Sequence, residues 1–147
     1  MIIKLAVLLP FFAAALIPLV HKFIKREQIG WFVLAVPIIL FALISSYIPH
    51  TANGKTFIHT LEWIPSLSIN FTTYLDGLSM IFGLLITGVG SLVILYSNFY
   101  LSAKESLHHF YCYLLLFMGA MLGVVFSDNL LVLYTFWELT SVSSFLL

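Results

Sequence analysis

Long runs of apolar, uncharged residues restrict what this chain can fold into more than any other feature of its sequence. A helix needs about 20 mostly apolar residues to cross a hydrocarbon layer about 30 Å thick. Four segments satisfy this requirement and a fifth nearly does; together they cover residues 2–20, 30–48, 77–100, 110–126 and 130–147. The pattern predicts an all-α integral membrane protein with five transmembrane helices.

The composition supports this fold class and narrows the kinds of function. Hydrophobic residues make up 62% of the chain and charged residues 8%, whereas soluble domains carry roughly 25% charged residues. The formal net charge is +0, so nothing indicates a nucleic-acid partner. A single cysteine, Cys112, excludes an internal disulfide and a thiolate cluster, and we interpret it as a small apolar filler. Because no motif for phosphate or metal binding is present, we predict neither a cofactor nor a metal.

The basic residues between the segments predict how the chain is oriented. Loops rich in Lys and Arg stay on the cytoplasmic side of a membrane. The loops on one side carry most of these residues, namely Lys22, Lys25, Arg26 and Lys104, and the other side has only Lys4 and Lys55. We therefore predict a multi-pass protein of the cell membrane with its N-terminus outside.

The first segment also has an alternative interpretation as a signal peptide, with the cleavage region at residues 13–15. A signal peptide has a basic start and a short apolar run. Here the run is long, contains Pro10 and Pro18, and is followed rather than preceded by the main basic cluster. We therefore favour a transmembrane helix.

The connection over residues 49–75 is the only long loop between the predicted helices. Its Asn53-Gly54 pair is typical of a turn. Residues 57–63 and 68–75 mix β-favouring and polar side chains, with Pro65 between them. We expect a short β-hairpin on the outer side, with an irregular loop as the alternative.

Small residues recur at helical spacing in two of the segments and predict where helices pack. Membrane helices approach closely where small side chains line one face. Such faces are formed by Ser79, Gly83, Thr87 and Ser91 in the third segment and by Gly119, Ala120 and Gly123 in the fourth. Near the predicted boundaries stand the aromatic residues Trp31, Trp63 and Tyr100, which we interpret as anchors at the membrane surface.

Several polar residues lie at the predicted helix ends. Asp76 and Asp128 each stand just before an apolar run, where an acid accepts hydrogen bonds from the first free amides of a helix, so we predict two helix caps. His108 and His109 lie where the fourth segment begins. Interfacial solvation is the simpler interpretation of this pair, and proton delivery from the cytoplasm is the alternative.

Glu138 is the one acidic residue inside the predicted segments. It lies eight residues beyond Leu130, which places it about 12 Å into the membrane. An acid at that depth costs at least about 2.5 kcal/mol, and such acids usually mark ion or proton pathways. At 100° per residue, its neighbours on the helix surface include Tyr134, Thr135 and Ser141. We predict that Glu138 carries a proton with these residues in support; the alternative is a protonated acid that only joins helices.

Four stretches together carry a family resemblance: residues 74–79 (Tyr-Leu-Asp-Gly-Leu-Ser), 111–125, 127–130 (Ser-Asp-Asn-Leu) and 136–147. They resemble the A-type subunits of Mrp-type multisubunit Na⁺/H⁺ antiporters, whose relatives include the antiporter-like subunits of respiratory complex I. The most specific part is Trp-Glu-Leu-Thr-Ser, which begins at Trp137 and follows the Ser-Asp-Asn turn.

The resemblance implies that Glu138 is the family's essential glutamate on the fifth helix, paired with a lysine on a later helix. It also implies a complex in the cytoplasmic membrane that exchanges Na⁺ for H⁺. The partners that it implies are other antiporter subunits, the lipid bilayer and the remainder of the same subunit. The chain stops at Leu147 without an interfacial flank, so we expect it to be the N-terminal part of a longer protein.

Two further functions stay open from the sequence. One is an antiporter-like, proton-pumping subunit of a redox-driven complex such as complex I or a membrane-bound hydrogenase, using the same Glu138. The other is a membrane scaffold that transports nothing and in which Glu138 only holds helices together.

Overall fold

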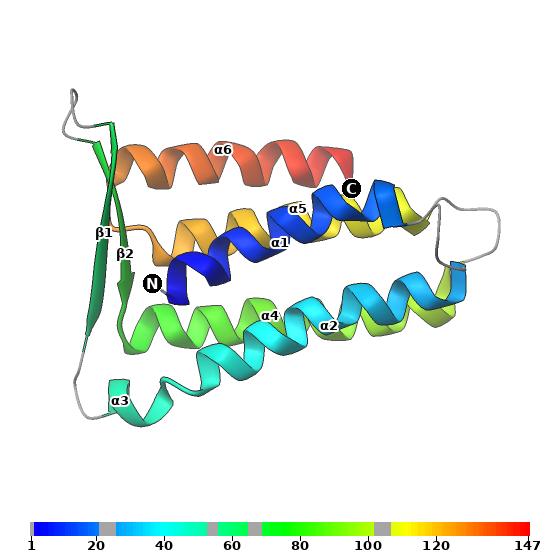
Figure 1. Ribbon diagram of the computed structural model, residues 1–147, viewed down its shortest axis with the longest axis horizontal. Coiled ribbons are helices and arrows are strands. Elements are labelled where there is room, and N and C mark those ends of the chain that lie inside the picture. Colours follow the sequence, from blue (N-terminus) through cyan, green and yellow to red (C-terminus); the bar gives the residue numbers. More distant parts are fainter. Residues whose placement is uncertain (1, 21–25, 53–55, 65–68, 102–106) are drawn as a thin grey trace.

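A computed structural model describes residues 2–20, 26–52, 56–64, 69–101 and 107–147. The elements in chain order are α1 (Ile2–Val20), α2 (Arg26–Ser45), α3 (Ile48–Ala52), β1 (Phe57–Ile64), β2 (Ile69–Leu75), α4 (Gly77–Tyr100), α5 (Leu107–Phe126) and α6 (Leu130–Leu146). Figure 1 shows the long helices side by side and the two strands across one end of them. We call this the hairpin end, and the other the opposite end.

The predicted all-α membrane fold is confirmed. Among the described residues, four helical stretches are long and apolar enough to cross a membrane: 3–20, 28–51, 77–100 and 107–126. The fifth predicted segment forms α6, which is shorter, at 17 residues. The predicted basic loop residues Lys22, Lys25 and Lys104 lie outside the described residues, so the orientation of the N-terminus stays a prediction.

The helix between residues 30 and 48 differs most from its predicted bounds. It begins earlier, at Arg26, and ends at Ser45, and the short helix α3 follows. The Ser46 hydroxyl donates a 2.6 Å hydrogen bond to the carbonyl of Leu43. Because Pro49 has no amide hydrogen to donate to the carbonyl four residues earlier, the helical ladder is interrupted there.

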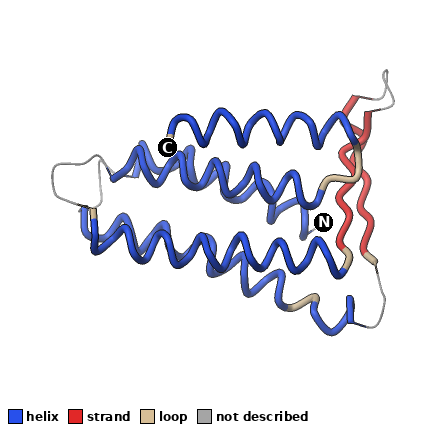
Figure 2. The backbone as a smooth tube through the Cα atoms, turned by 180° about the vertical axis from the view of Figure 1, so that it is seen from behind, coloured by secondary structure: helices blue, strands red, loops and turns tan. Residues whose placement is uncertain are grey.

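The predicted β-hairpin is confirmed. β1 and β2 pair antiparallel, from Phe57 opposite Leu75 to Ile64 opposite Ile69, with an irregularity between Glu62 and Ile64. Figure 2 shows the two strands running across the helix ends. The predicted turn at Asn53-Gly54, Pro65 and the side chain of Trp63 lie outside the described residues.

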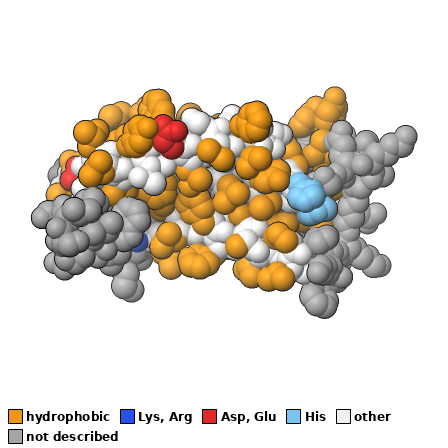
Figure 3. Space-filling model, turned by 90° about the horizontal axis from the view of Figure 1, so that it is seen from above, with side chains coloured by type: hydrophobic (Ala, Val, Ile, Leu, Met, Phe, Trp, Pro, Cys, Tyr) orange, Lys and Arg blue, Asp and Glu red, His pale blue; other side chains and the backbone are white. Residues whose placement is uncertain are grey.

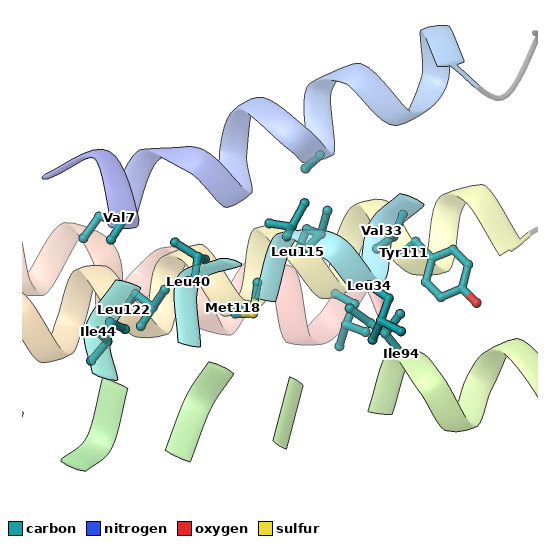
Figure 4. Packing of buried hydrophobic residues seen from close by; sticks show 14 of the residues in the cluster. Val7, Val33, Leu34, Leu40, Ile44, Ile94, Tyr111, Leu115, Met118 and Leu122 are labelled. Atoms are coloured by element: carbon teal, nitrogen blue, oxygen red, sulfur yellow. The ribbon is translucent and has the colours of Figure 1, made fainter. Parts of the chain in front are cut away.

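Helix α5 forms the centre of the helix packing, in contact with α1, α4 and α6. Its buried side chains include Tyr111, Leu115 and Leu122, none of which has measurable exposure. Figure 4 shows Leu115, Met118 and Leu122 of α5 clustered with buried side chains of α1, α2 and α4. At the opposite end, Trp31 and Tyr100 are exposed, as expected of residues that meet a membrane surface.

Glycines let aromatic rings of neighbouring helices lie directly against the helix backbone. A Cβ atom at Gly119 would lie 2.9 Å from the Phe11 ring of α1, and one at Gly123 would collide with the Phe136 ring of α6. Gly83 of α4 receives the Phe126 ring in the same way. The prediction that these small residues are packing faces is therefore confirmed.

Replacing Gly123 with Ala should destabilise the protein, because the new methyl group collides with the Phe136 ring, and overpacking of this kind costs about 1–3 kcal/mol. Gly77→Ala is the matched control, because a Cβ there meets nothing within 4 Å. The measurement is thermal unfolding of the purified protein in detergent. Equal midpoints for both variants would contradict this view of the packing.

Asp76 caps α4, as predicted. Its carboxylate accepts a 2.8 Å hydrogen bond from the Ser79 amide, and the Ser79 hydroxyl accepts a 2.9 Å hydrogen bond from the Asp76 amide. The hydrogen bonds from the Ser79 amide and hydroxyl hold the pKa of Asp76 below its usual value. This capping box ties the first turn of α4 to the end of β2.

Replacing Asp76 with Ala should cost about 1 kcal/mol of stability near neutral pH. Because folding lowers the pKa of Asp76, its contribution is complete above the unfolded-state value of about 3.9 and is lost as the pH falls through the lower folded-state value. Unfolding midpoints of the two proteins should therefore converge in acid. A difference that stays constant down to about pH 2 would contradict the ionised cap.

Candidate functional site

The candidate site lies on α6, and its position depends first on how that helix begins. Asn129 is the N-cap: its side-chain oxygen accepts a 2.9 Å hydrogen bond from the Leu131 amide. The prediction that Asp128 caps this helix is therefore wrong. A capping side chain must reach the second or third amide of the helix, and Asp128 lies one residue too early. Instead, the Asp128 amide donates a 3.1 Å hydrogen bond to the Thr72 carbonyl of β2.

Phe136 determines which way α6 faces. Its ring lies against Gly123 of α5 and 6.3 Å from the ring of Phe11 in α1. The buried residues Val132 and Ser143 of α6 fall near the same direction on the helix surface. Glu138 follows Phe136 by two residues, which is a rotation of about 200°. Its carboxyl therefore points away from α5.

Glu138 is exposed in this structure, as are Tyr134, Thr135 and Ser141. Figure 3 shows acidic atoms next to hydrophobic side chains on the face seen from above in the view of Figure 1. The described residues that line a shallow groove of about 390 Å³ beside the carboxyl all belong to α6, namely Leu130, Leu131, Leu133, Tyr134, Trp137 and Glu138. Within the described residues, Glu138 does not face the interior of the helix bundle.

The predicted supporting residues share the Glu138 face but interact with it unequally. The Tyr134 phenol lies close enough to Glu138 to interact with it electrostatically. The Thr135 hydroxyl donates to the Leu131 carbonyl at 2.9 Å, and the Ser141 hydroxyl donates to the Trp137 carbonyl at 3.5 Å. Tyr134 is therefore the direct neighbour of the carboxyl. The sequence interpretation did not include Trp137, which also lines this groove; adjacent helix residues are rotated by about 100°, so its spacing from the acid gave no signal.

His108 and His109 lie at the opposite end, with ring centroids 4.1 Å apart. The His109 ring stacks on Tyr113, with centroids 6.3 Å apart and planes 13° apart. His109 and Tyr113 line a recess of about 350 Å³ that also involves Leu147 but does not include Glu138. The structure therefore does not bring the histidines together with the acid. Among the described residues, no three His, Cys, Asp or Glu side chains form a metal-binding group.

Three comparisons relate the chain to known proteins. Residues 63–111 match the family described as the N-terminus of chain 5 of NADH-ubiquinone oxidoreductase (complex I). Over 146 residues, or 99% of the chain, it is 59% identical to the A1 subunit of a Na⁺/H⁺ antiporter from Staphylococcus haemolyticus strain JCSC1435. It is 57% identical over the same length to the A1 subunit of the Na⁺/H⁺ antiporter from Staphylococcus aureus.

Two solved structures of membrane complexes also contain chains that match this one. The Mrp complex from Dietzia sp. DQ12-45-1b contains a chain that matches all of this one with a TM-score of 0.83 and 31% identity, over 16% of that chain. A membrane-bound sulfane sulfur reductase, an archaeal respiratory membrane complex, matches 98% of this chain with a TM-score of 0.84, over 29% of its own chain. Its identity is 23%, so this likeness concerns the fold alone.

The comparisons confirm the resemblance to the A-type subunits of Mrp-type antiporters and to the antiporter-like subunits of complex I. They also support a multi-pass membrane protein. The chain spans 18% of the length of the curated relatives that it matches.

Proposed function

We propose that this chain is the N-terminal part of a subunit of a multisubunit Na⁺/H⁺ antiporter, in which Glu138 carries the transported proton. The observation that carries the proposal is the position of this acid. Glu138 lies halfway along α6 (Leu130–Leu146), on a helix whose neighbouring residues are mostly apolar. An acid held at that depth is costly, and membrane proteins keep such acids where they serve ion or proton movement.

The direction of Glu138 adds a second element to the proposal. The carboxyl is exposed on the side of α6 that faces away from α5, and the chain spans 18% of the length of its curated relatives. We propose that the remainder of the subunit covers this face and supplies the cation that the described helices do not place beside Glu138. The family resemblance implies that this cation is a lysine.

The proposed chemistry requires Glu138 to change its protonation with its surroundings. Removing water favours the neutral carboxyl, whereas an approaching ammonium group favours the carboxylate. Movement of the lysine toward Glu138 would therefore release a proton, and movement away would allow the acid to take up another. Tyr134, which lies beside the carboxyl and interacts with it electrostatically, would help to hold it in place through this cycle.

Glu138→Gln in the complete subunit should abolish Na⁺-dependent proton movement in everted membrane vesicles, because the amide has nearly the same shape but does not gain or lose a proton near neutral pH. Asp128→Asn is the matched control: it also removes one acid from the same region, but its exposed side chain lies before the helix, so exchange should be retained. The amount of assembled complex is measured for both variants. Full exchange by an assembled Glu138→Gln complex would refute the proposal.

The match of residues 63–111 to a complex I family favours one further candidate, a proton-pumping subunit of a redox-driven complex. Both candidates use Glu138, so the driving reaction separates them. The antiporter exchanges Na⁺ for H⁺ in vesicles with no electron donor, whereas the redox-driven pump moves protons only while a donor is oxidised. A scaffold without transport would lose assembly, but not turnover, when Glu138 is replaced.

A further inference from the structure

Strand β2 touches the beginnings of two helices that lie on different sides of α5. At its C-terminal end, Leu75 is followed directly by Asp76, the cap of α4. Two residues before Leu75, Thr73 forms an isolated antiparallel bridge with Ser127, in the turn between α5 and α6. One short strand therefore joins the first turn of α4 to the turn from which α6 starts.

The contact with the turn is specific and well packed. The Asp128 amide donates a 3.1 Å hydrogen bond to the Thr72 carbonyl, and Thr73 has no measurable exposure. This hydrogen bond joins the residues that flank the Thr73–Ser127 pair, so these two residues form a non-hydrogen-bonded pair, in which the side chains lie close together. We call the contact of Thr72 and Thr73 with Ser127 and Asp128 the strand–turn bridge.

Helix α6 packs mainly on one neighbouring helix. Its buried residues are Val132 and Ser143, and its main partner is α5. The Phe136 ring seated against Gly123 determines the direction that α6 faces and holds α6 against α5. The strand–turn bridge, in contrast, connects α6 by a directional hydrogen bond to an element that crosses the helix ends (Figure 1).

We propose that the strand–turn bridge is a positioning element that sets the depth of the Glu138 carboxyl in the membrane. The positioning groups are the Asp128 amide and the Thr72 carbonyl; the Asp128 amide stands two residues before α6, whose first residue, Leu130, lies about 12 Å along the helix axis from the acid. The inference rests on the proposed function of Glu138 and adds to it how that residue is held in place.

Depth matters because the surroundings of an acid change steeply across a membrane. A slip of α6 by one residue moves Glu138 by about 1.5 Å along the axis and rotates it by about 100°. The cost of ionising a carboxyl depends on this depth. Loss of the bridge should therefore change the pH at which exchange is half-maximal, rather than only the amount of folded protein.

The first test compares Asp128→Pro with Asp128→Ala in the complete antiporter complex. Both variants remove the carboxylate, but only proline removes the amide that bonds Thr72. Exchange is measured in everted vesicles as a function of pH. We expect the midpoint of the Asp128→Pro profile to move by about half a pH unit or more relative to Asp128→Ala. Coincident profiles would overturn the inference.

The second test examines the strand–turn bridge directly and applies if the Asp128→Pro complex fails to assemble. In a Cys112→Ser background, Thr73→Cys combined with Ser127→Cys places two thiols in a non-hydrogen-bonded pair, where Cα atoms lie about 4.5 Å apart and a disulfide can form. We expect the disulfide to form and the oxidised complex to keep its exchange rate within about twofold and its pH midpoint unchanged, since the link reproduces the native bridge. Failure to cross-link, or a loss of exchange that a reductant reverses, would contradict the inference that the strand–turn bridge stays in place during exchange.

The two hypotheses fail in distinguishable ways. Full exchange by Glu138→Gln would refute the proposed function whatever the bridge does. If Glu138→Gln is inactive but the Asp128→Pro and Asp128→Ala profiles coincide, the role of Glu138 stands and only the positioning role of the bridge is lost.

Discussion

The seating of aromatic rings against the glycines of α5 is the interaction on which the rest of the arrangement depends. Lipid tails are as apolar as the helices, so membrane helices associate through close packing rather than by escaping water. Gly119 and Gly123 allow Phe11 of α1 and Phe136 of α6 to reach the α5 backbone. These contacts hold α1 and α6 on α5 and, through Phe136, determine the side of α6 on which Glu138 is exposed.

Polar groups are placed where hydrogen bonds can satisfy them without weakening this packing. The Thr87 and Ser91 hydroxyls of α4 donate to carbonyls one turn earlier, both at 2.8 Å, so these small side chains enter a packed face without unmet hydrogen bonds. At the hairpin end, Asp76 and Asn129 accept hydrogen bonds from the first amides of α4 and α6. Glu138 is the exception, because its charge has no cation beside it among the described residues. The proposed function depends on this missing cation, because a lysine that approaches Glu138 from elsewhere would change its protonation.

The lengths of the apolar runs were enough to predict the transmembrane helices, and the alternation around Phe57 and Tyr74 was enough for the hairpin. The start of α6 at Leu130 was predicted, but the residue that caps it was not, because Asp128 and Asn129 are both good caps. The outward direction of Glu138 was not predictable either, because polar residues lie on both the exposed side of α6 (Ser141) and its buried side (Ser143), so its periodicity does not indicate the packed face. That face depends on Phe136 meeting Gly123, which is a tertiary contact.

The central claim is that Glu138 gains and loses a proton during exchange, and infrared difference spectroscopy measures this directly. Spectra of the purified complete complex are recorded on changing from a proton-rich, sodium-free state to a sodium-rich one. We predict a protonated-carboxyl band that disappears in the sodium-rich state and that is missing altogether from Glu138→Gln. An unchanged band in both states, or the same difference spectrum in the variant, would contradict the claim.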